Sequence, residues 1–203
     1  MPYDPSQVYQ PEADTYLLLD AARTEVKPGD RVLEVGTGSG LIVAELAGVT
    51  GVIATDINPH AALCAREKGI DVVRNDLFSG IRSTFDLIVF NPPYLPTLSE
   101  DRIDDWLEYA LDGGMNGREV IGRFAAEVGR VLAPGGRILL LISSLTGVPE
   151  VRDIFLRQSF ESEIIMKQKV EDENLYVLRI VRRDERQAKK TGKDFSQARE
   201  SLF

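Results

Sequence analysis

Short β-rich runs alternate with helical patterns along most of the chain, and this alternation restricts the possible folds more than any other feature. We expect buried strands at 31–35, 51–55, 70–73, 85–90 and 137–142, and helices at 41–47, 58–68, 117–132 and 148–158. Such alternation is typical of a parallel sheet with right-handed crossovers. Strands at 160–167 and 175–181 have no helix between them and predict an antiparallel edge hairpin. The sequence therefore predicts an α/β fold with a doubly wound seven-stranded sheet.

The chain has 203 residues, a length that suits one domain with a substantial core. Residues 12–26 have the spacing of an amphipathic helix, so we expect 1–28 to form a helical lead-in to the sheet. The end of the chain, 183–203, is charged and poor in apolar residues, which is typical of a flexible tail. We therefore predict a single domain at 1–182 followed by that tail.

Composition excludes several classes of protein. The formal net charge of −8 lowers the expectation of phosphate-backbone binding, which normally needs a basic face. One cysteine, Cys64, and one histidine, His60, leave no cluster for zinc; we expect Cys64 to be buried and His60 to lie at the surface. There is neither a basic leader nor a run of roughly 20 apolar residues, so we expect a cytoplasmic protein.

A glycine-rich loop joins the first strand to the following helix. Gly36, Thr37, Gly38 and Gly40 lie in this loop, where glycine lets the backbone turn tightly and approach a ligand. The second strand ends at Asp56, about 20 residues after the first glycine, where a carboxylate accepts hydrogen bonds from a ribose diol. A loop of this kind also occurs as a plain tight turn, so its meaning depends on the acidic residues around it.

Glu34 separates two classes of cofactor. A pyrophosphate bound at the helix N-terminus would be repelled by a carboxylate at the start of the loop. S-adenosylmethionine carries an ammonium and a sulfonium and no phosphate, so Glu34 suits it. Asp76, after the third strand, is expected to accept a hydrogen bond from the adenine amino group; its alternative role is that of a turn residue.

The segment Asn91-Pro92-Pro93-Tyr94 follows an apolar strand and should lie at the carboxyl edge of the sheet, where ligands bind in this fold class. The two prolines stiffen the segment and remove N–H donors. An amide or aryl NH₂ group has two donors and a poorly nucleophilic nitrogen. We expect the Asn91 side chain and the Pro92 carbonyl to accept both N–H groups, and Tyr94 to stack on the planar group.

The glycine loop, Asp56 and this NPPY segment together resemble the class I S-adenosylmethionine methyltransferases that modify amide or exocyclic nitrogen. Over residues 8 to 182 the chain is similar to the short archaeal and eukaryotic HemK-type release factor glutamine methyltransferases. The segments that carry this closer resemblance are Val8-Tyr9-Gln10-Pro11, Asp14-Thr15, Thr55-Asp56-Ile57-Asn58-Pro59, Phe90-Asn91-Pro92-Pro93-Tyr94, Gly113-Gly114 and Asn116-Gly117-Arg118-Glu119. The last of these is the most discriminating, because few methyltransferases have it after NPPY.

The resemblance implies a Rossmann-like fold, S-adenosylmethionine as cofactor, and methylation of the glutamine in the Gly-Gly-Gln loop of class I release factors. Asn91 to Tyr94 would hold that glutamine. It also implies a small zinc-binding activator protein as a heterodimer partner that covers apolar surface. The residues expected to bind the cofactor are Thr15, Glu34, Gly36, Thr37, Gly38, Gly40, Asp56, Ile57, Asp76, Leu77 and Asn91.

Two further segments bear on this reading. The family pattern Pro-Ala-Glu-Asp-Thr appears here as Pro11-Glu12-Ala13-Asp14-Thr15, which moves the acid by one residue, about 100° around a helix.

We expect residues 95–115 to form a lip over the substrate, with a solvated acidic face or a docking site for a basic protein. The acidic residues of this lip are Glu100, Asp101, Asp104, Asp105 and Glu108, around Trp106. Arg118 and Glu119 brace the NPPY loop or lie on a helix surface.

Two other functions remain open at this point. A nucleic-acid methyltransferase acting on adenine N6 or guanine N2 would use the same NPPY geometry, but it usually has a basic channel or an added recognition domain. A subunit that binds the cofactor without catalysing transfer would not need Asn91. The acidic charge disfavours the first alternative, and the presence of Asn91 disfavours the second.

Overall fold

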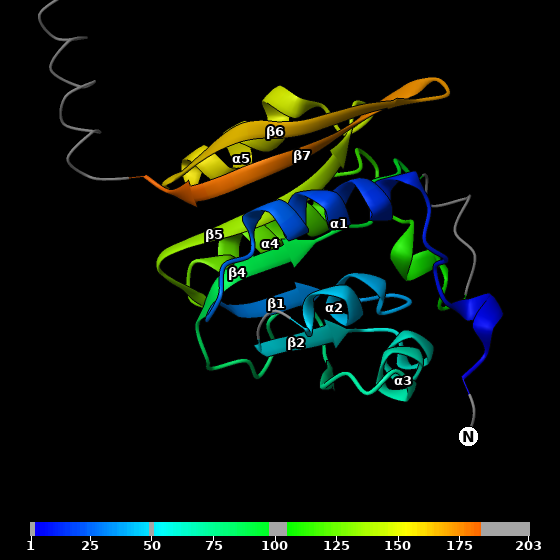
Figure 1. Ribbon diagram of the computed structural model, residues 1–203. Coiled ribbons are helices and arrows are strands. Elements are labelled where there is room, and N and C mark those ends of the chain that lie inside the picture. The colour runs from blue at the N-terminus through cyan, green and yellow to red at the C-terminus, as the bar shows by residue number, and fades with distance from the viewer. Residues whose placement is uncertain (1–2, 49–50, 98–104, 184–203) are drawn as a thin grey trace, which may run out of the picture.

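A seven-stranded sheet with the strand order β3-β2-β1-β4-β5-β7-β6 organises the molecule (Figure 1). The structure is a computed structural model that describes residues 3–48, 51–97 and 105–183. The strands are β1 (Arg31–Val35), β2 (Gly51–Asp56), β3 (Val72–Arg74), β4 (Phe85–Phe90), β5 (Leu132–Ser143), β6 (Phe160–Val170) and β7 (Glu173–Arg182). β1 to β5 are parallel, and β7 pairs antiparallel with both β5 and β6. The predicted α/β fold with its C-terminal edge hairpin is confirmed.

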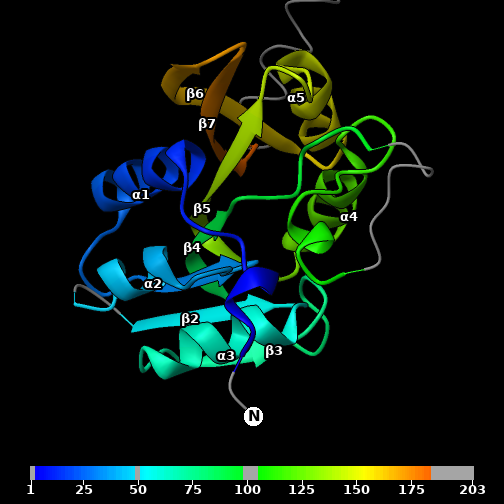
Figure 2. The same ribbon diagram turned by 90° about the vertical axis from the view of Figure 1, so that its right-hand side faces the viewer.

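Helices cover both faces of this sheet. They are α1 (Ala13–Glu25), α2 (Leu41–Leu46), α3 (Pro59–Glu67), α4 (Glu119–Val128) and α5 (Val148–Arg157), with short 3-10 turns η1 (Pro5–Gln7) and η2 (Glu108–Ala110). Figure 2 shows α1 and α2 on one side of the sheet and α4 and α5 on the other. Successive side chains of a strand point to opposite faces of the sheet, so neighbouring residues pack against different helix layers. Leu87 and Val89 of β4 contact the α1–α2 layer, whereas Ile88 and Phe90 contact the α4–α5 layer.

The start of β5 differs from the expectation. The sequence Ala133-Pro134-Gly135-Gly136 predicts a turn before a strand at 137, but β5 already begins at Leu132. The register jumps here, because Phe85 pairs with Leu132 and Leu87 with Arg137. Gly135 has a φ of +74°, which lets the extra residues loop out while the strand stays paired on both sides. The predicted turn is thus a bulge within the strand.

The ends of α4 also differ from the prediction of a helix over 117–132. Gly117 has a φ of +69°, outside the helical region, so the helix begins at Glu119. It ends at Val128, because the following residues turn into β5. Cys64 is buried, as expected. His60 is partly exposed, so it reaches the surface as expected, and its Nδ1 accepts a hydrogen bond of 2.9 Å from the Asp4 backbone N–H.

One corner of the sheet lacks a covering helix on the α4–α5 side. The chain between β3 and β4, residues 75–84, forms no helix in the structure. The register places Ile53 opposite Leu33 and Val73 opposite Thr55, so Ile53 and Val73 share the face that α4 and α5 cover further along the sheet. Ile53 is 36% exposed and Val73 is 44% exposed. We call this pair the β2–β3 apolar face.

The structure does not describe the segments on which two of the predictions depend, the C-terminal tail and part of the lip. The expected C-terminal tail lies outside the described residues from 184 onward, as do Glu100, Asp101 and Asp104 of the expected lip. Among the described residues, none of the helices has the length and apolar character that crossing a membrane requires.

Candidate active site

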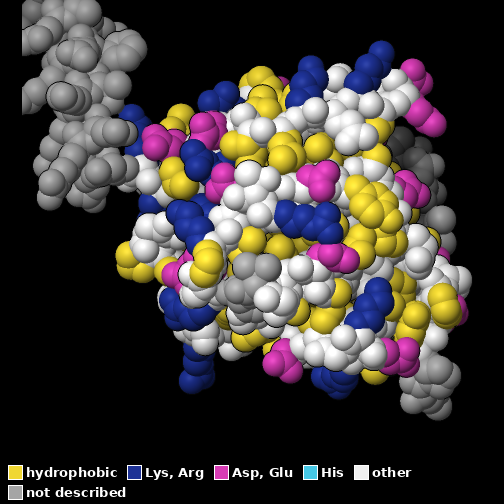
Figure 3. Space-filling view, in the orientation of Figure 1, with side chains coloured by type: hydrophobic (Ala, Val, Ile, Leu, Met, Phe, Trp, Pro, Cys, Tyr) yellow, Lys and Arg dark blue, Asp and Glu magenta, His cyan; other side chains and the backbone are white. Residues whose placement is uncertain are grey.

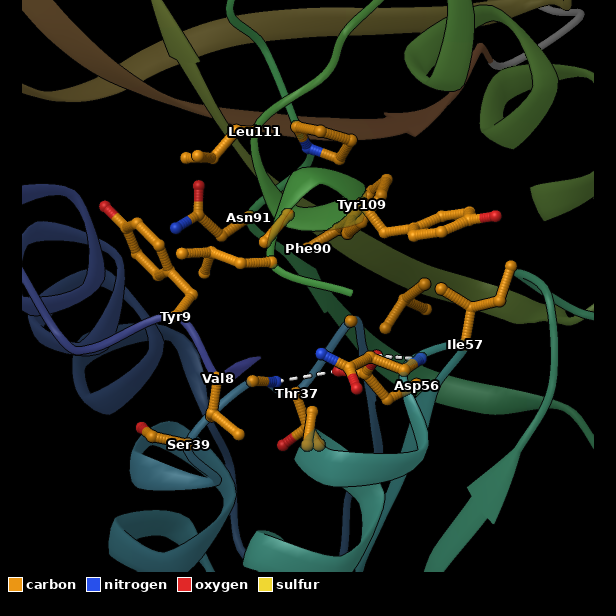
Figure 4. A pocket seen from close by; sticks show the side chains of 18 of the residues that line it. Val8, Tyr9, Thr37, Ser39, Asp56, Ile57, Phe90, Asn91, Tyr109 and Leu111 are labelled. Carbon is orange, nitrogen blue, oxygen red and sulfur yellow. Dashed lines mark hydrogen bonds between the residues drawn. The ribbon is translucent and has the colours of Figure 1, made fainter. Parts of the chain in front are cut away.

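A cavity of about 720 Å³ opens at the carboxyl ends of β1, β2 and β4. This size is within the range of small-molecule sites, and the place is where ligands bind in doubly wound sheets. Figure 4 shows Thr37, Asp56 and Ile57 toward one end of the cavity and Tyr9, Asn91 and Leu111 toward the other. The predicted cofactor residues that line it are Thr15, Glu34, Gly36, Thr37, Gly38, Asp56, Ile57, Asp76, Leu77 and Asn91.

Gly40 is the predicted cofactor residue that does not line this cavity. It precedes α2 in the left-handed conformation, with a φ of +76°. A β-carbon at this position would lie 2.9 Å from the β-carbon of Ala65 in α3. Gly40 therefore allows α2 and α3 to pack closely, and the glycine contacts available to a cofactor are those of Gly36 and Gly38.

Asp56 ties the glycine loop to the end of β2. Its Oδ2 accepts a hydrogen bond of 2.9 Å from the Gly38 N–H, and its Oδ1 accepts one of 2.8 Å from the Asn58 N–H. Burial raises the pKa of this carboxyl, and the backbone N–H groups of Gly38, Asn58 and Ile57 oppose that shift. Each carboxylate oxygen can accept more than one hydrogen bond, so Asp56 keeps the capacity to bind a diol.

Glu34 is buried at the start of the loop. The Thr37 hydroxyl donates to its Oε2 over 2.6 Å. Burial raises the pKa of Glu34 to about 8, while hydrogen bonds from Thr37 and from the Val43 N–H favour the ionised form. A cation bound beside Glu34 would favour its ionised form and so lower this pKa. A cofactor with an ammonium group fits this environment.

Asp76 has a partner that the sequence did not reveal. Its Oδ2 lies 2.5 Å from Nη2 of Arg123 in α4, and both side chains are partly exposed. Leu77, the next residue, has a φ of +48°, an uncommon value for a residue with a branched side chain. Both residues line the cavity, as does Arg123. The predicted contact of Asp76 with adenine would therefore be made by a carboxylate that an arginine already orients.

Asn91 follows β4 directly and lines the cavity. Its Nδ2 donates to Asp14 Oδ2 over 2.9 Å. Its Oδ1 is buried and has no hydrogen-bond partner among the described residues. Pro93 and Tyr94 also line the cavity, whereas Pro92 is buried and does not line it. A side-chain acceptor is thus available at Asn91, and the role of the Pro92 carbonyl stays a prediction.

Sequence reasoning missed Tyr9 and Asp14 as site residues. Asp14 is 3% exposed, and its Oδ1 accepts hydrogen bonds from both the backbone and the hydroxyl of Thr15. Its Oδ2 accepts from Tyr9 over 3.1 Å and, at the longer distance of 3.4 Å, from Tyr94. The signal for Asp14 was present, because it stands beside Thr15 in a segment shared with the resembling family.

The N-terminal segment also contributes to the site, which the sequence did not indicate. Asn58 caps α3, since its Oδ1 accepts from the His60 N–H. Its Nδ2 in addition donates to the backbone oxygens of Gln7 and Trp106. Gln7 Oε1 accepts from the Trp106 N–H over 2.9 Å. The start of the chain and the segment after residue 104 are thus joined beside the cavity that both line.

Asp105, an acidic residue of the expected lip, makes a local contact. Its Oδ1 accepts a hydrogen bond of 2.9 Å from the N–H of Glu108, the first residue of η2. Trp106 stacks on Tyr109 with ring centroids 5.2 Å apart, and Arg74 lies over the Trp106 ring. These contacts show a structural role for this part of the segment and leave its docking role as a prediction.

The segment 113–119 braces the NPPY loop through its backbone rather than through Arg118 and Glu119. The Gly113 N–H donates to the Leu95 carbonyl, and the Thr97 N–H donates to the Gly114 carbonyl. Arg118 instead donates to the Thr146 carbonyl, and Glu119 accepts from the Met115 N–H. Of the two alternatives left open for these side chains, bracing of the NPPY loop is therefore not supported by their hydrogen bonds.

The residues around the cavity fit the cofactor expected from the sequence. Three carboxylates, Glu34, Asp56 and Asp76, line one end, where a cation and a diol would find acceptors. Two side-chain oxygens in the same lining, Thr55 Oγ1 and Asn75 Oδ1, are buried without a hydrogen-bond partner among the described residues. Buried polar atoms are normally paired, so both atoms indicate a ligand with donors to offer. S-adenosylmethionine has these donors and the matching positive charge.

Comparisons with known proteins identify the family. The family model described as the methyltransferase small domain matches residues 10–104. A protein of Methanocaldococcus jannaschii, provisionally named a protein N5-glutamine methyltransferase, is 41% identical over 180 residues, covering 85% of this chain and 90% of that protein. Human methyltransferase HEMK2 is 36% identical over 194 residues, covering 87% of this chain and 91% of that protein.

A solved structure agrees with these sequence matches. It is that of the E. cuniculi Mtq2-Trm112 complex, responsible for the methylation of the eRF1 translation termination factor. The similarity has a TM-score of 0.73 at 32% identity and covers 87% of this chain and 99% of that one. The fold, the cavity and these relatives confirm the resemblance found in the sequence. The chain belongs to the HemK-type protein glutamine methyltransferases, within the class I S-adenosylmethionine-dependent methyltransferases.

Proposed function

We propose that this protein methylates the side-chain amide nitrogen of a glutamine in a class I release factor, within the Gly-Gly-Gln loop. The observation that carries the proposal is the buried Asn91 Oδ1 beside the cofactor cavity, an acceptor that has no hydrogen-bond partner in the described part of the chain. A primary amide presents N–H donors that satisfy such an acceptor. The relatives support the choice of substrate, since the Mtq2-Trm112 complex methylates eRF1.

The cofactor, when bound, supplies an electrophilic methyl group on a positively charged sulfur. Glu34 offers a carboxylate to its ammonium group, Asp56 offers acceptors to the ribose diol, and Asp76 offers one to the adenine amino group. Asn91 Oδ1 accepts an N–H of the substrate amide, which orients the nitrogen and stabilises positive charge on it. The Pro92 carbonyl is the proposed second acceptor. No strong base is required, because the substituted nitrogen can lose its proton to solvent.

The experiment is transfer of labelled methyl groups from S-adenosylmethionine to a purified class I release factor. We expect label on the factor and none on a variant whose Gly-Gly-Gln glutamine is replaced by alanine. DNA and transfer RNA serve as competing acceptors in parallel reactions. Label on nucleic acid but not on the factor would overturn the proposal in favour of an amino methyltransferase. Absence of label on every acceptor, with cofactor bound, would favour a non-catalytic subunit.

The electrostatics favour the protein acceptor over nucleic acid. Basic and acidic side chains are interspersed over the face shown in Figure 3. The net charge of the chain is −8. A net negative charge disfavours binding of a phosphate backbone and suits a basic partner. The proposal assigns catalysis to residues 1–182 and implies a cytoplasmic location, because release factors act there on ribosomes.

We further propose that a small zinc-binding activator of the Trm112 type covers the β2–β3 apolar face. Mtq2, the relative with the solved structure, is in complex with Trm112. Ile53 and Val73 expose apolar surface where residues 75–84 provide no helix, and covering them would remove that surface from water. Co-expression with such an activator, followed by co-purification, tests this. We expect Ile53→Asp to abolish co-purification and Leu156→Asp, on the exposed side of α5, to leave it unchanged.

A further inference from the structure

The carboxylate of Asp14 is the centre of a buried hydrogen-bond cluster that has no role in the reaction proposed above. It is 3% exposed. Five groups donate to it: the Thr15 N–H, the Thr15 hydroxyl, the Tyr9 hydroxyl, the Asn91 Nδ2 and, at 3.4 Å, the Tyr94 hydroxyl. The contact with Asn91 joins residues that are 77 positions apart. The first turn of α1 thus contacts the NPPY segment through one side chain.

This contact decides which way the Asn91 amide points. An ionised carboxylate accepts hydrogen bonds and cannot donate, so only the NH₂ end of Asn91 can face Asp14. The Oδ1 end must then face the other way. In Figure 4 the Asn91 nitrogen lies toward Tyr9 and its oxygen toward Leu111. Rotating the amide by half a turn would place oxygen against a buried carboxylate and break a charge-assisted hydrogen bond, which is unfavourable.

The two tyrosines act as hydrogen-bond donors to Asp14. Burial and the Asp14 charge raise the pKa of both Tyr9 and Tyr94, so both hydroxyls remain protonated donors at neutral pH. Because these hydroxyls donate to Asp14 Oδ2, this oxygen serves as an acceptor, and Asn91 turns its NH₂ end toward it.

We propose that Asp14 is a positioning residue that holds Asn91 with its side-chain oxygen available to the substrate amide. The proposal rests on the function proposed above, in which Asn91 Oδ1 accepts an N–H of glutamine. Asp14 acts in two ways. It excludes the inverted amide, which would present donors to a donor, and its hydrogen bond polarises the amide so that Oδ1 becomes a stronger acceptor. Both effects operate while charge develops on the substrate nitrogen.

A different role for Asp14 leads to different kinetics. Asp14 lines the same cavity as Glu34, so its carboxylate is also within the surroundings of the cofactor. If Asp14 served chiefly to bind the cofactor, its loss would weaken cofactor affinity whether or not Asn91 were present. If it acts through Asn91, its loss matters only while Asn91 is present.

The test is a double-mutant cycle of Asp14→Asn and Asn91→Ala, assayed with labelled cofactor and a release factor under single-turnover conditions. We expect Asp14→Asn to lower the transfer rate by roughly 100-fold while the cofactor Kd changes by less than about threefold. In the Asn91→Ala background, we expect Asp14→Asn to change the remaining rate by less than about threefold. The matched control is Asp20→Asn, an exposed aspartate of the same helix, which should behave as wild type.

Two outcomes of the cycle would overturn the proposal. One is a rate loss for Asp14→Asn that is equally large with and without Asn91. The other is weaker cofactor binding with an unchanged transfer rate. Full transfer by Asn91→Ala would instead refute the role proposed for Asn91. Absence of methylation of the release factor by the wild-type protein would refute the proposed function. The failure of the function and the failure of the Asp14 role are therefore distinguishable.

A second measurement requires neither activity nor a folded Asp14 variant. In the NMR spectrum of the wild-type protein, the Asn91 side-chain NH₂ signals are assigned by their loss in Asn91→Ala. We expect one of the two Nδ2 protons to be protected from solvent exchange, because it donates to a buried carboxylate. Rapid exchange of both protons would contradict the proposed orientation. This result also decides the proposal if residual transfer by Asn91→Ala is too slow to measure.

Discussion

Gly113 lies directly against the carbonyl oxygen of Pro93. A β-carbon at position 113 would lie 2.9 Å from that oxygen and 2.7 Å from the α-carbon of Gly117. Both distances are too short for real β-carbons, so backbone would have to move. Gly113 and Gly117 thus pack on the NPPY loop main chain to main chain, which is possible because neither has a side chain.

We therefore expect Gly113→Ala to disturb the loop that carries Asn91. Overpacking of this kind destabilises by about 1–3 kcal/mol, and a displaced catalytic group costs up to about 100-fold in rate. Thermal unfolding and single-turnover transfer to a release factor measure the two effects. Gly122→Ala in α4 is the control, because a β-carbon there meets nothing within 4 Å. Unchanged transfer by Gly113→Ala would show that the loop does not depend on this packing.

Asn91→Ala should separate cofactor binding from catalysis. Asn91 is only one of several residues expected to contact the cofactor, so the cofactor Kd should stay within about tenfold of wild type. The rate of methyl transfer should fall steeply, because the acceptor for the substrate N–H group is removed. Calorimetric titration with the cofactor and a labelled-transfer assay give the two numbers. Near-normal transfer would exclude the proposed grip on the amide.

Glu34 should make the stability of the cofactor-free protein depend on pH. Burial raises its pKa to about 8 from an ordinary value of 4.5, so the folded state keeps a proton that the unfolded state loses. The stabilising contribution of the neutral form is complete below the ordinary pKa and is lost as pH rises toward about 8. The slope for one proton reaches about 1.4 kcal/mol per pH unit.

The measurement is the free energy of unfolding of wild type and Glu34→Gln between about pH 5 and pH 9. Glutamine does not titrate, so the stability of wild type relative to the variant should decline through this range and level off above about pH 8. Parallel curves for the two proteins would show that Glu34 is ionised throughout in the folded state.

Asp76→Ala should weaken cofactor binding selectively. Loss of one hydrogen bond to the adenine amino group corresponds to about 0.5–1.5 kcal/mol, or roughly two- to tenfold in Kd. Arg123→Ala should have a smaller effect, because it leaves the Asp76 carboxylate in place. Asp86→Ala is a suitable control, since Asp86 also pairs with an arginine, Arg31, but does not line the cavity. Equal Kd values for Asp76→Ala and Asp86→Ala would remove Asp76 from the adenine site.

The sequence predicted well those features that depend on neighbouring residues. The strand at 31–35 and the strand at 85–90 have the predicted bounds, because a short run rich in apolar and β-branched residues and its flanking turn residues act locally. The start of β5 was misjudged because a glycine pair has the same local preference in a turn and in a bulge. Only pairing with Phe85 on a neighbouring strand selects the bulge.

By itself, the sequence determined the order of the elements, the glycine loop at the end of β1 and the place of Asn91 after β4, because periodicity and backbone preference are written in adjacent residues. Only the tertiary structure decided that Asp14 meets Asn91, that Arg123 orients Asp76 and that Asn58 joins the N-terminal segment to Trp106. These contacts depend on how loops from distant parts of the chain pack at one edge of the sheet. No local preference of the residues involved specifies that packing.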